Sequence, residues 1–116
     1  MEIQQSIELF FLLVAVHFLC DFSLQNDFIA QAKNHKTALG SEYWHWVLPA
    51  HGFIHGLGVY LVTGSVIYGL IEVVVHSLID YSKCDGYLDF NADQFLHLFF
   101  KFMYVLMISQ GILIFS

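Results

Sequence analysis

The sequence predicts an all-α membrane protein in which four helices form one antiparallel transmembrane bundle. Three observations support this prediction: an excess of apolar residues, four apolar segments of helical length, and short connections between them. Of the 116 residues, 58% are hydrophobic and 12% are charged, and the mean hydropathy is +0.66. A soluble domain has roughly 45–50% apolar and about 25% charged residues, and small domains bury the smallest share of their surface. We therefore expect lipid to cover the excess apolar surface.

The apolar segments organise residues 1–116 into a single transmembrane domain. The four segments cover residues 3–25, 48–63, 66–82 and 92–115. The second and third are shorter than the roughly 20 residues of a full span, so we expect them to cross a thin or locally compressed bilayer. Pro49 falls in the predicted first turn of the second helix, where its missing N–H is harmless. Gly64 and Ser65 predict a tight turn between the second and third helices.

The lysines predict the orientation of the bundle. In an up-down-up-down arrangement the two longer connections, near 30–47 and 83–91, share one face. Lys33, Lys36 and Lys83 lie in these connections. Because positive charges favour the cytoplasmic side, we expect the long loops in the cytoplasm.

Charge and cysteine content argue against other classes of protein. The net charge is −6, with four lysines and no arginine, whereas a nucleic-acid surface needs clustered cations. Cys20 and Cys84 are too few for a disulfide framework. The N-terminus, MEIQQSIELF, lacks the positive n-region and the small-residue cleavage site of a signal peptide.

Each predicted helix carries one pair of polar residues spaced by four, and every pair contains histidine. Residues at i and i+4 lie on the same helix face, about one turn apart. The pairs lie near the end of the first and third helices and near the start of the second and fourth. Because neighbouring helices run in opposite directions, all four pairs reach a similar depth, near the face that carries the two lysine-containing connections. The members of the four pairs are His17, Asp21, His51, His55, His76, Asp80, Asp93 and His97.

Five imidazoles and three carboxylates at one depth predict a metal centre, as in helical bundles that bind two metal ions. These ligands suit Zn, Fe, Mn and Ni; we expect Zn, as one or two ions. The three carboxylates and a bridging hydroxide would neutralise two divalent ions, which reduces the penalty for burying charge. Asp21, Asp80 and Asp93 are also the candidate catalytic bases. The alternative is that these groups form hydrogen bonds between helices without any metal.

Three residues beside the pairs are candidates for a supporting role. Gln25, Gln94 and Lys83 adjoin the pairs in the sequence. Such side chains can hold metal ligands in place or contact a substrate, and Lys83 would suit an anionic one. The sequence leaves both roles open, together with a solvated position for Lys83.

Four further ionisable residues are interpreted from their positions in the sequence alone. Glu72 precedes His76 by one turn, and Lys101 follows the last histidine by one turn. Either side chain can extend the cluster or lie outside it, and Lys101 can snorkel. His35 and His45 are interpreted as solvated or interfacial residues of a loop.

The stretches HFLCDFSLQNDF, HGFIH, HSLIDYSK and ADQFLH together resemble a family of small bacterial and phage membrane proteins catalogued as domain of unknown function 3307. The likeness covers nearly the whole chain, and its most specific elements are His-x3-Asp-Phe-x-Leu-Gln and Asp-Gln-x2-His. It implies an intact membrane protein of the bacterial inner membrane, which can be phage-encoded, and it implies no activity. A looser likeness to inner-membrane metal-dependent hydrolases is an analogy of ligand chemistry.

We predict an intramembrane metal-dependent hydrolase acting on a lipid or lipid-linked ester or phosphoester. A metal ion generates hydroxide from water near neutral pH, and a centre close to one membrane face suits a lipid substrate. Two alternatives remain. Intramembrane ionisable residues also mark pathways for metal ions or protons, which allows transport or sensing. The protein can also be a structural, phage-type membrane modulator in which the metal is only stabilising.

Overall fold

The computed structural model describes residues 1–112, and every regular element in that range is a helix, which confirms the all-α prediction. The long helices are α1 (Ile3–Phe18), α3 (Ala38–Thr63), α4 (Val66–Cys84) and α5 (Phe90–Ser109). A π-helical turn, η1 (Leu19–Ser23), continues α1, and the short α2 (Asp27–Ala32) follows it.

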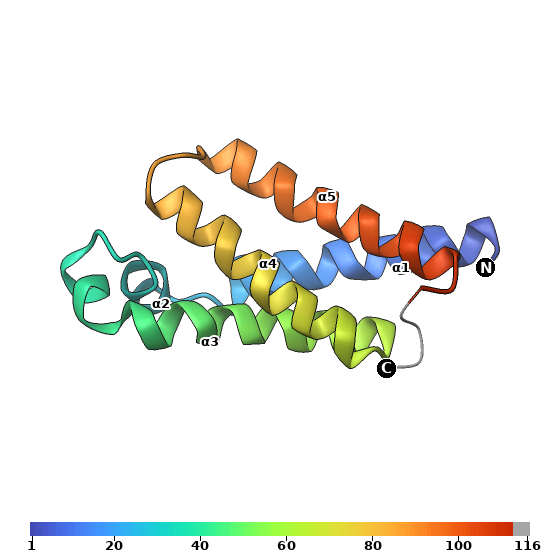
Figure 1. Cartoon of the computed structure of the whole chain (residues 1–116), viewed down its shortest axis with the longest axis horizontal. Helices are drawn as coiled ribbons and strands as arrows, with labels where there is room; N and C mark the ends of the chain where they lie inside the picture. The colour runs from blue at the N-terminus through green and yellow to red at the C-terminus, as the bar shows by residue number, and fades with distance from the viewer. Residues whose placement is uncertain (113–116) are drawn as a thin grey trace.

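The four long helices run alternately in opposite directions as an antiparallel bundle (Figure 1). Helix α3 packs on α1 and α4, and α5 packs on the other side of α1 and α4, so the helices surround a shared interior. The connections 33–37 and 85–89 lie at one end, which we call the loop end. The N-terminus and the turn at 64–65 lie at the opposite end. The two longer connections therefore share one end, as the helix spacing predicts.

The second long helix begins at Ala38, not near residue 48 as the apolar segment predicted. Thr37 caps it, and the Thr37 Oγ1 accepts the backbone N–H of Gly40 at 2.9 Å. Pro49 therefore lies inside α3 rather than in its first turn, where it removes one helical hydrogen bond. The boundary was misplaced because the helix extends through a polar stretch that hydropathy assigned to a loop.

The last helix ends at Ser109, before the predicted boundary near 115. Gly111 adopts a φ of 78°, a left-handed conformation suited to glycine. The N–H groups of Gly111 and Ile112 donate to helix carbonyls at 2.9 and 3.0 Å, which completes a Schellman motif. Positions 113–115 of the predicted segment lie outside the described residues.

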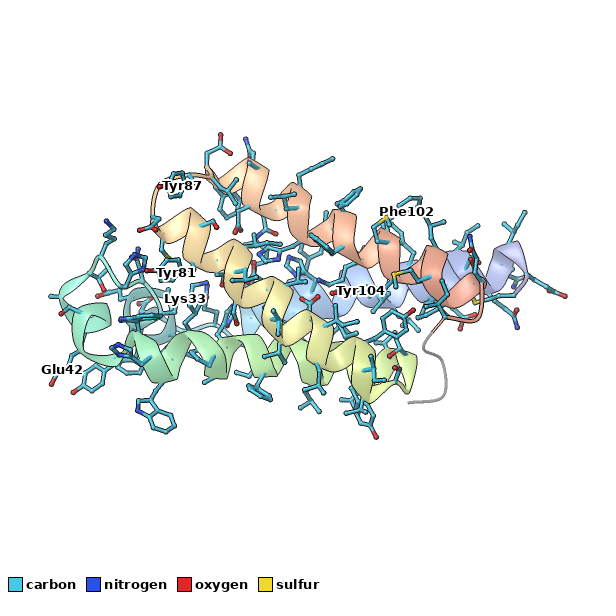
Figure 2. The ribbon with its side chains drawn as sticks, viewed as in Figure 1. Lys33, Glu42, Tyr81, Tyr87, Phe102 and Tyr104 are labelled. Atoms are coloured by element: carbon cyan, nitrogen blue, oxygen red, sulfur yellow. The ribbon has the colours of Figure 1, made fainter. Side chains whose placement is uncertain are left out.

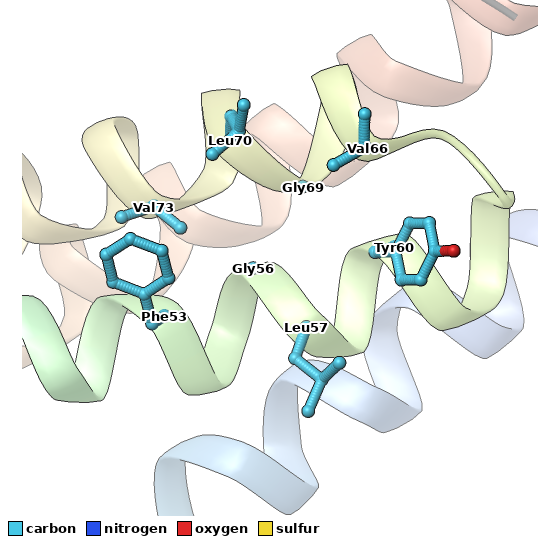
Figure 3. Close-up of a pocket in the computed structure, with 8 residues that line it drawn as sticks. All are labelled: Phe53, Gly56, Leu57, Tyr60, Val66, Gly69, Leu70 and Val73. Atoms are coloured by element: carbon cyan, nitrogen blue, oxygen red, sulfur yellow. The ribbon is translucent and has the colours of Figure 1, made fainter. Parts of the chain in front are cut away.

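Glycines allow α3 and α4 to approach closely (Figure 3). A Cβ added at Gly56 would lie 2.7 Å from the Gly69 carbonyl oxygen, and one at Gly69 would lie 2.9 Å from the Gly56 carbonyl oxygen. Small residues produce similar backbone contacts between helices in membranes. The outer side of this contact is an apolar groove of about 200 Å³, lined by Phe53, Gly56, Leu57, Tyr60, Val66, Gly69, Leu70 and Val73.

Polar residues fill much of the interior, whereas large apolar side chains cover the outside. Among the described residues, twelve polar or charged side chains are buried against nine hydrophobic ones. Phe11, Leu61, Leu78 and Phe95 illustrate the outer surface, since each is more than 60% exposed. A soluble protein buries most such residues. The bundle therefore has an apolar exterior around a polar centre.

By length and composition, the described helices include one candidate membrane span, Ile3–Ser23, where the sequence predicted four. A signal sequence or a core helix of a soluble protein meets the same criterion. The other long helices carry buried polar residues such as His51, Glu72 and Asp93, which lower their hydropathy. Hydropathy alone therefore supports one candidate membrane-spanning helix and does not support the predicted bundle of four.

A contact between His35 and Asp85 ties the two connections together at the loop end. The His35 Nε2–H donates to the Asp85 Oδ1 at 2.7 Å, and the His35 ring stacks on Tyr81 at 4.1 Å. This hydrogen bond lowers the pKa of Asp85 below its usual value. The contribution to stability is therefore present at neutral pH and is lost as the pH falls below the usual carboxylate range. His35 was predicted to be a solvated or interfacial loop residue, but the fold gives it a structural contact; His45 is exposed on α3.

We expect Gly56→Ala to destabilise the protein. Alanine favours an exposed helix by about 1 kcal/mol over glycine, but here the new Cβ meets backbone atoms of α4. Overpacking of this kind costs about 1–3 kcal/mol. Thermal unfolding would measure the change, with Leu57→Ala, an outward-facing position next to it, as the control. A melting temperature equal to or above that of the wild type would contradict the close packing.

Candidate metal centre

The eight residues of the four pairs converge on one buried centre. The four long helices and η1 supply them, toward the loop end of the bundle. Each of the eight is between 0% and 7% exposed. The common depth predicted from the sequence thus brings five imidazoles and three carboxylates into contact.

A π-helical turn places Asp21 at this centre. The backbone N–H of Leu24 donates to the Leu19 carbonyl at 2.9 Å, a hydrogen bond spanning five residues. Such turns are rare and occur frequently at functional sites. The turn leaves the Asp21 Oδ2 3.7 Å from the Nε2 of His17. The sequence predicted both residues on one face but not this change in helical phase.

Three imidazole nitrogens surround one oxygen of Asp21. The Asp21 Oδ1 lies 3.2 Å from the Nε2 of His51, 3.3 Å from that of His55 and 3.8 Å from that of His76. The ligands of a tetrahedral ion bound at about 2.0–2.1 Å are about 3.3 Å apart. Asp21, His51, His55 and His76 form one group whose geometry can hold a metal ion.

Asp80 forms the middle of a second, adjoining group. The Asp80 Oδ1 lies 3.2 Å from the His97 Nε2, and the Asp80 Oδ2 lies 3.3 Å from the His76 Nε2. The His97 Nε2 also lies 3.4 Å from the Asp93 Oδ1. Asp80, Asp93 and His97 can hold an ion, and so can His17, His76 and His97. Because His76 contacts both Asp21 and Asp80, the two groups are continuous and share ligand residues.

Several ligand atoms at the centre lack hydrogen bonds. Among the described residues, the Nε2 atoms of His55 and His76 and the Oδ1 of Asp93 are buried and make none. A buried polar atom without a partner costs about 1–3 kcal/mol. A divalent ion would accept their lone pairs, so the donor set fits a metal ion.

Two lysines complete the charge balance of the interior. The Lys33 Nζ donates to the Asp80 Oδ2 at 2.9 Å, and the Lys101 Nζ donates to the Glu72 Oε2 at 2.8 Å. The Tyr104 hydroxyl donates to the other Glu72 oxygen at 2.8 Å. With neutral imidazoles, four buried carboxylates and two buried lysines leave two negative charges. One divalent ion would neutralise these two charges, whereas two ions would require two further negative charges. The balance predicted from the sequence set three carboxylates and one hydroxide against two ions, because it did not include Glu72 and the two lysines.

Glu72 and Lys101, left open by the sequence, both lie inside the bundle. Glu72 is 0% exposed and Lys101 is 1% exposed. The Glu72 Oε2 lies 3.4 Å from the His76 Nδ1, so its charge favours the proton on that nitrogen and leaves the His76 Nε2 lone pair toward the centre. The i,i+4 spacing of each residue to a histidine was the signal in the sequence. Tyr104 sits between the helices further from the loop end (Figure 2).

The glutamines differ in how they meet the centre. The Gln94 amide donates to the Asp21 Oδ2 at 2.7 Å, and its Oε1 lies 3.1 Å from the His17 Nε2. Gln94 therefore joins two ligand positions directly. Gln25 donates to the Asp21 backbone carbonyl, at 3.2 Å, and so meets the backbone rather than the side chain of this residue.

Lys83 lies beside the centre, at a polar hollow of about 150 Å³ that we call the loop-end hollow. Its lining residues are Gln25, Ala30, Lys33, Asn34, Asp80, Lys83 and Cys84. Figure 2 shows Lys33 at this end of the bundle, near Tyr81. The sequence offered no signal that Lys33 would reach Asp80, because the contact joins residues 47 positions apart.

The fold and the centre define an all-α protein whose buried histidines and aspartates can hold a metal ion. The chain belongs to the family described as Protein of unknown function (DUF3307), whose model matches residues 9–114. This range includes every residue of the centre, and the match confirms the family likeness inferred from the motifs. No curated protein and no solved structure matches the chain. The bacterial or phage origin and the likeness to hydrolases stay predictions.

We expect Glu72→Gln to destabilise the fold, because it leaves the buried Lys101 ammonium without a counter-charge. Breaking a buried ion pair costs roughly 3–5 kcal/mol. The double variant Glu72→Gln/Lys101→Met removes both charges and should recover much of the loss. Unfolding free energies of the two single variants and the double variant would measure the coupling. Additive effects would show that the pair contributes no interaction energy.

Proposed function

We propose that the chain is an integral membrane protein whose buried centre binds divalent metal ions and hydrolyses a lipid or lipid-linked phosphoester or ester. The observation that supports this most is the convergence of eight ligand residues from η1 and all four long helices. Their closest N···O separations suit a first-row metal ion, and several of the atoms have no other partner. We expect Zn as one or two ions, with Mn, Fe or Ni as alternatives.

The distribution of apolar side chains supports a membrane position. Only 22% of the 18-residue apolar stretch within the candidate span is buried inside the protein, whereas a core helix of a soluble protein would be mostly buried. Removal of this segment as a signal sequence would also remove His17 and Asp21 from the centre. The exposed apolar residues of α3, α4 and α5 extend the same surface around the bundle, which supports insertion of all four long helices.

The loop end is the proposed cytoplasmic side. Lys33, Lys36 and Lys83 lie at or beside its connections, and positive charges near membrane helices favour the cytoplasm. The centre lies toward this end, so a lipid headgroup reaches it from the loop-end hollow. We therefore propose a membrane lipid as the partner and the bacterial inner membrane as the location of the protein.

The three carboxylates divide into ligands and a base. A divalent ion held by these residues would polarise the substrate and lower the pKa of a water molecule. Within 4.0 Å, Asp21 contacts four imidazoles and Asp80 contacts three, so both are suited to ligation. Asp93 contacts one imidazole, at 3.4 Å, and is the proposed proton acceptor. Hydrolysis forms a bond from the water oxygen to the reacting phosphorus or carbonyl carbon and breaks the ester bond, while Asp93 takes the water proton and returns one to the departing alcohol.

A transport function is the second candidate, because buried polar groups continue beyond the centre. Glu72, Lys101 and Tyr104 extend the polar chain away from the loop end. Beyond Tyr104 the bundle is mainly apolar, with Leu13 and Val59 both buried, and its polar groups are hydroxyls such as that of Tyr68, which donates to the Ile112 carbonyl at 2.6 Å. Among the described residues, no buried acid, lysine or histidine lies beyond Glu72 and Lys101 toward that end, which favours a site open from one end and hence the hydrolase.

We expect purified wild-type protein to contain or reload about one or two divalent ions per chain. His55→Ala leaves one ligand position for water, so partial metal loss should follow. Asp80→Asn leaves Lys33 unpaired beside the cationic centre and should lower both metal content and stability, by roughly 3–5 kcal/mol for the lost buried pair. Elemental analysis and thermal unfolding would measure both quantities.

His45→Ala is the matched control for these variants, because His45 lies on α3 but is exposed. It should retain the metal content of the wild type. Wild-type protein that neither retains nor reloads any divalent ion would refute the metal centre.

We expect Asp93→Asn to lower turnover about 10²–10⁴-fold, the usual contribution of a general base, with little change in metal content. An asparagine oxygen can still accept the Gln94 amide, which contacts Asp93 at 3.2 Å. Turnover would be measured on a panel of phosphoester and ester lipids. Full metal content with no turnover on any member would reject hydrolysis and favour transport or a structural role. Unchanged turnover in Asp93→Asn would remove Asp93 as the base.

A further inference from the structure

We propose that the loop-end hollow binds the phosphate group of a phosphate ester, held between the ammonium groups of Lys33 and Lys83. This inference names the substrate class of the proposed hydrolase and rests on that function for its chemistry. The hollow has a volume of about 150 Å³, and Asp80 of the metal centre forms part of its wall. A ligand in it therefore contacts the centre directly.

The two lysines of the hollow differ from the third lysine at this end. Lys36 is a surface residue whose side chain is 62% exposed and pairs with Asp85 at 3.6 Å. Lys33 is 8% exposed and already pairs with Asp80. Lys83 lies 5.0 Å from the centre of the Phe90 ring and has no carboxylate within 4.0 Å among the described residues. Asp80 compensates Lys33, so the charge of Lys83 is the one left without a counter-charge at the hollow, and an anion bound there would offset it.

Two amide side chains add hydrogen-bonding capacity to the same hollow. The Asn34 Oδ1 accepts the Lys36 backbone N–H at 2.9 Å, which leaves its NH₂ group available to donate to an anion. The Gln25 Oε1 is buried without a hydrogen bond among the described residues. This acceptor suits a hydroxyl of a phosphomonoester or of a headgroup. The lining thus matches a ligand that is anionic and carries a hydroxyl.

Charge balance favours phosphate over carboxylate. The interior carries two negative charges, as counted above, so two divalent ions would leave two positive charges. A phosphate monoester supplies up to two negative charges, whereas a carboxylate supplies one. A phosphate monoester would therefore neutralise the interior when the centre holds two ions, and Lys83, which this count omits, adds one positive charge at the entrance. Leu24 and Phe28 flank this region in the sequence and are exposed, which suits a lipid phosphate more than a soluble one.

Alkylation of Cys84 gives a direct test of occupancy. Cys84 lines the hollow and is half-buried, whereas Cys20 is 3% exposed. The rate of alkylation of metal-loaded protein would be measured in neutral detergent with phosphatidic acid, with diacylglycerol or with inorganic phosphate, and Cys84→Ser is the blank. A ligand that blocks the thiol slows its reaction by 1 + [L]/Kd, about elevenfold at ten times Kd. We expect phosphatidic acid to protect and diacylglycerol, which lacks the phosphate, to have no effect.

Lys83→Gln tests the role of the cation without altering any residue of the centre. We expect the concentration of phosphatidic acid that gives half-protection to rise about tenfold or more, as for the loss of a hydrogen bond to a charged group. Lys36→Gln is the matched control and should behave as the wild type. Each alkylation rate is compared with the rate of the same variant without ligand. This comparison is needed because Lys83 precedes Cys84 directly, so its substitution can itself change the reactivity of the thiol.

The results separate this proposal from the hydrolase. Protection by phosphatidic acid alone supports a lipid phosphate, and equal protection by inorganic phosphate supports a site for soluble phosphate esters. Absence of protection by either, or equal protection in Lys83→Gln and Lys36→Gln, overturns the phosphate site even if the protein hydrolyses esters. Lysine-dependent protection without turnover supports the phosphate site and rejects hydrolysis.

Discussion

The compensation of charge inside the bundle is the constraint on which the rest of the structure depends. Four carboxylates and two lysines are buried among helices whose outer faces are apolar. Isolated charges in such surroundings are strongly unfavourable, so each must meet an opposite charge or a ligand. Lys33 compensates Asp80 and Lys101 compensates Glu72. The negative charge that remains is the physical reason for expecting a cation at the centre.

The helix packing creates the space in which this compensation occurs. The contact at Gly56 and Gly69 holds α3 close to α4, while the half of the bundle away from the loop end is closed by apolar residues such as Leu13 and Val105. The buried histidines and aspartates therefore lie toward the loop end, and Glu72 and Lys101 follow them toward the apolar half. The free energy of burying the charged centre is unfavourable without its ion. The well-packed apolar half of the bundle can offset this cost and hold the ligand residues in position.

The arrangement of polar groups along the bundle links structure to the proposed chemistry. The loop-end hollow leads to Asp80, the ligand residues follow, and Glu72 with Tyr104 extends the series toward the apolar half. A site open from one side suits a reaction on a headgroup, because the substrate enters and leaves by the same route. The same series would serve proton movement only if the apolar half opened. Lys33 lines the hollow and pairs with Asp80 of the centre, so an anion bound in the hollow as proposed would affect the charge at the ligands.

The helical class and the common depth of eight histidines and aspartates were predictable from the sequence, because the i,i+4 spacing is local and identifies the face of each helix. The sequence did not determine the start of α3, the interior position of Pro49 or the π-helical turn at Asp21, since these depend on caps and packing rather than on hydropathy. Only the tertiary structure decided that Lys33 pairs with Asp80 and that Glu72 and Lys101 lie inside. The rotation of each helix, and hence its partner across the bundle, follows from contacts between distant residues. Hydropathy also scores a buried charge as it scores an exposed one, which is why one helix rather than four meets the criterion for a span.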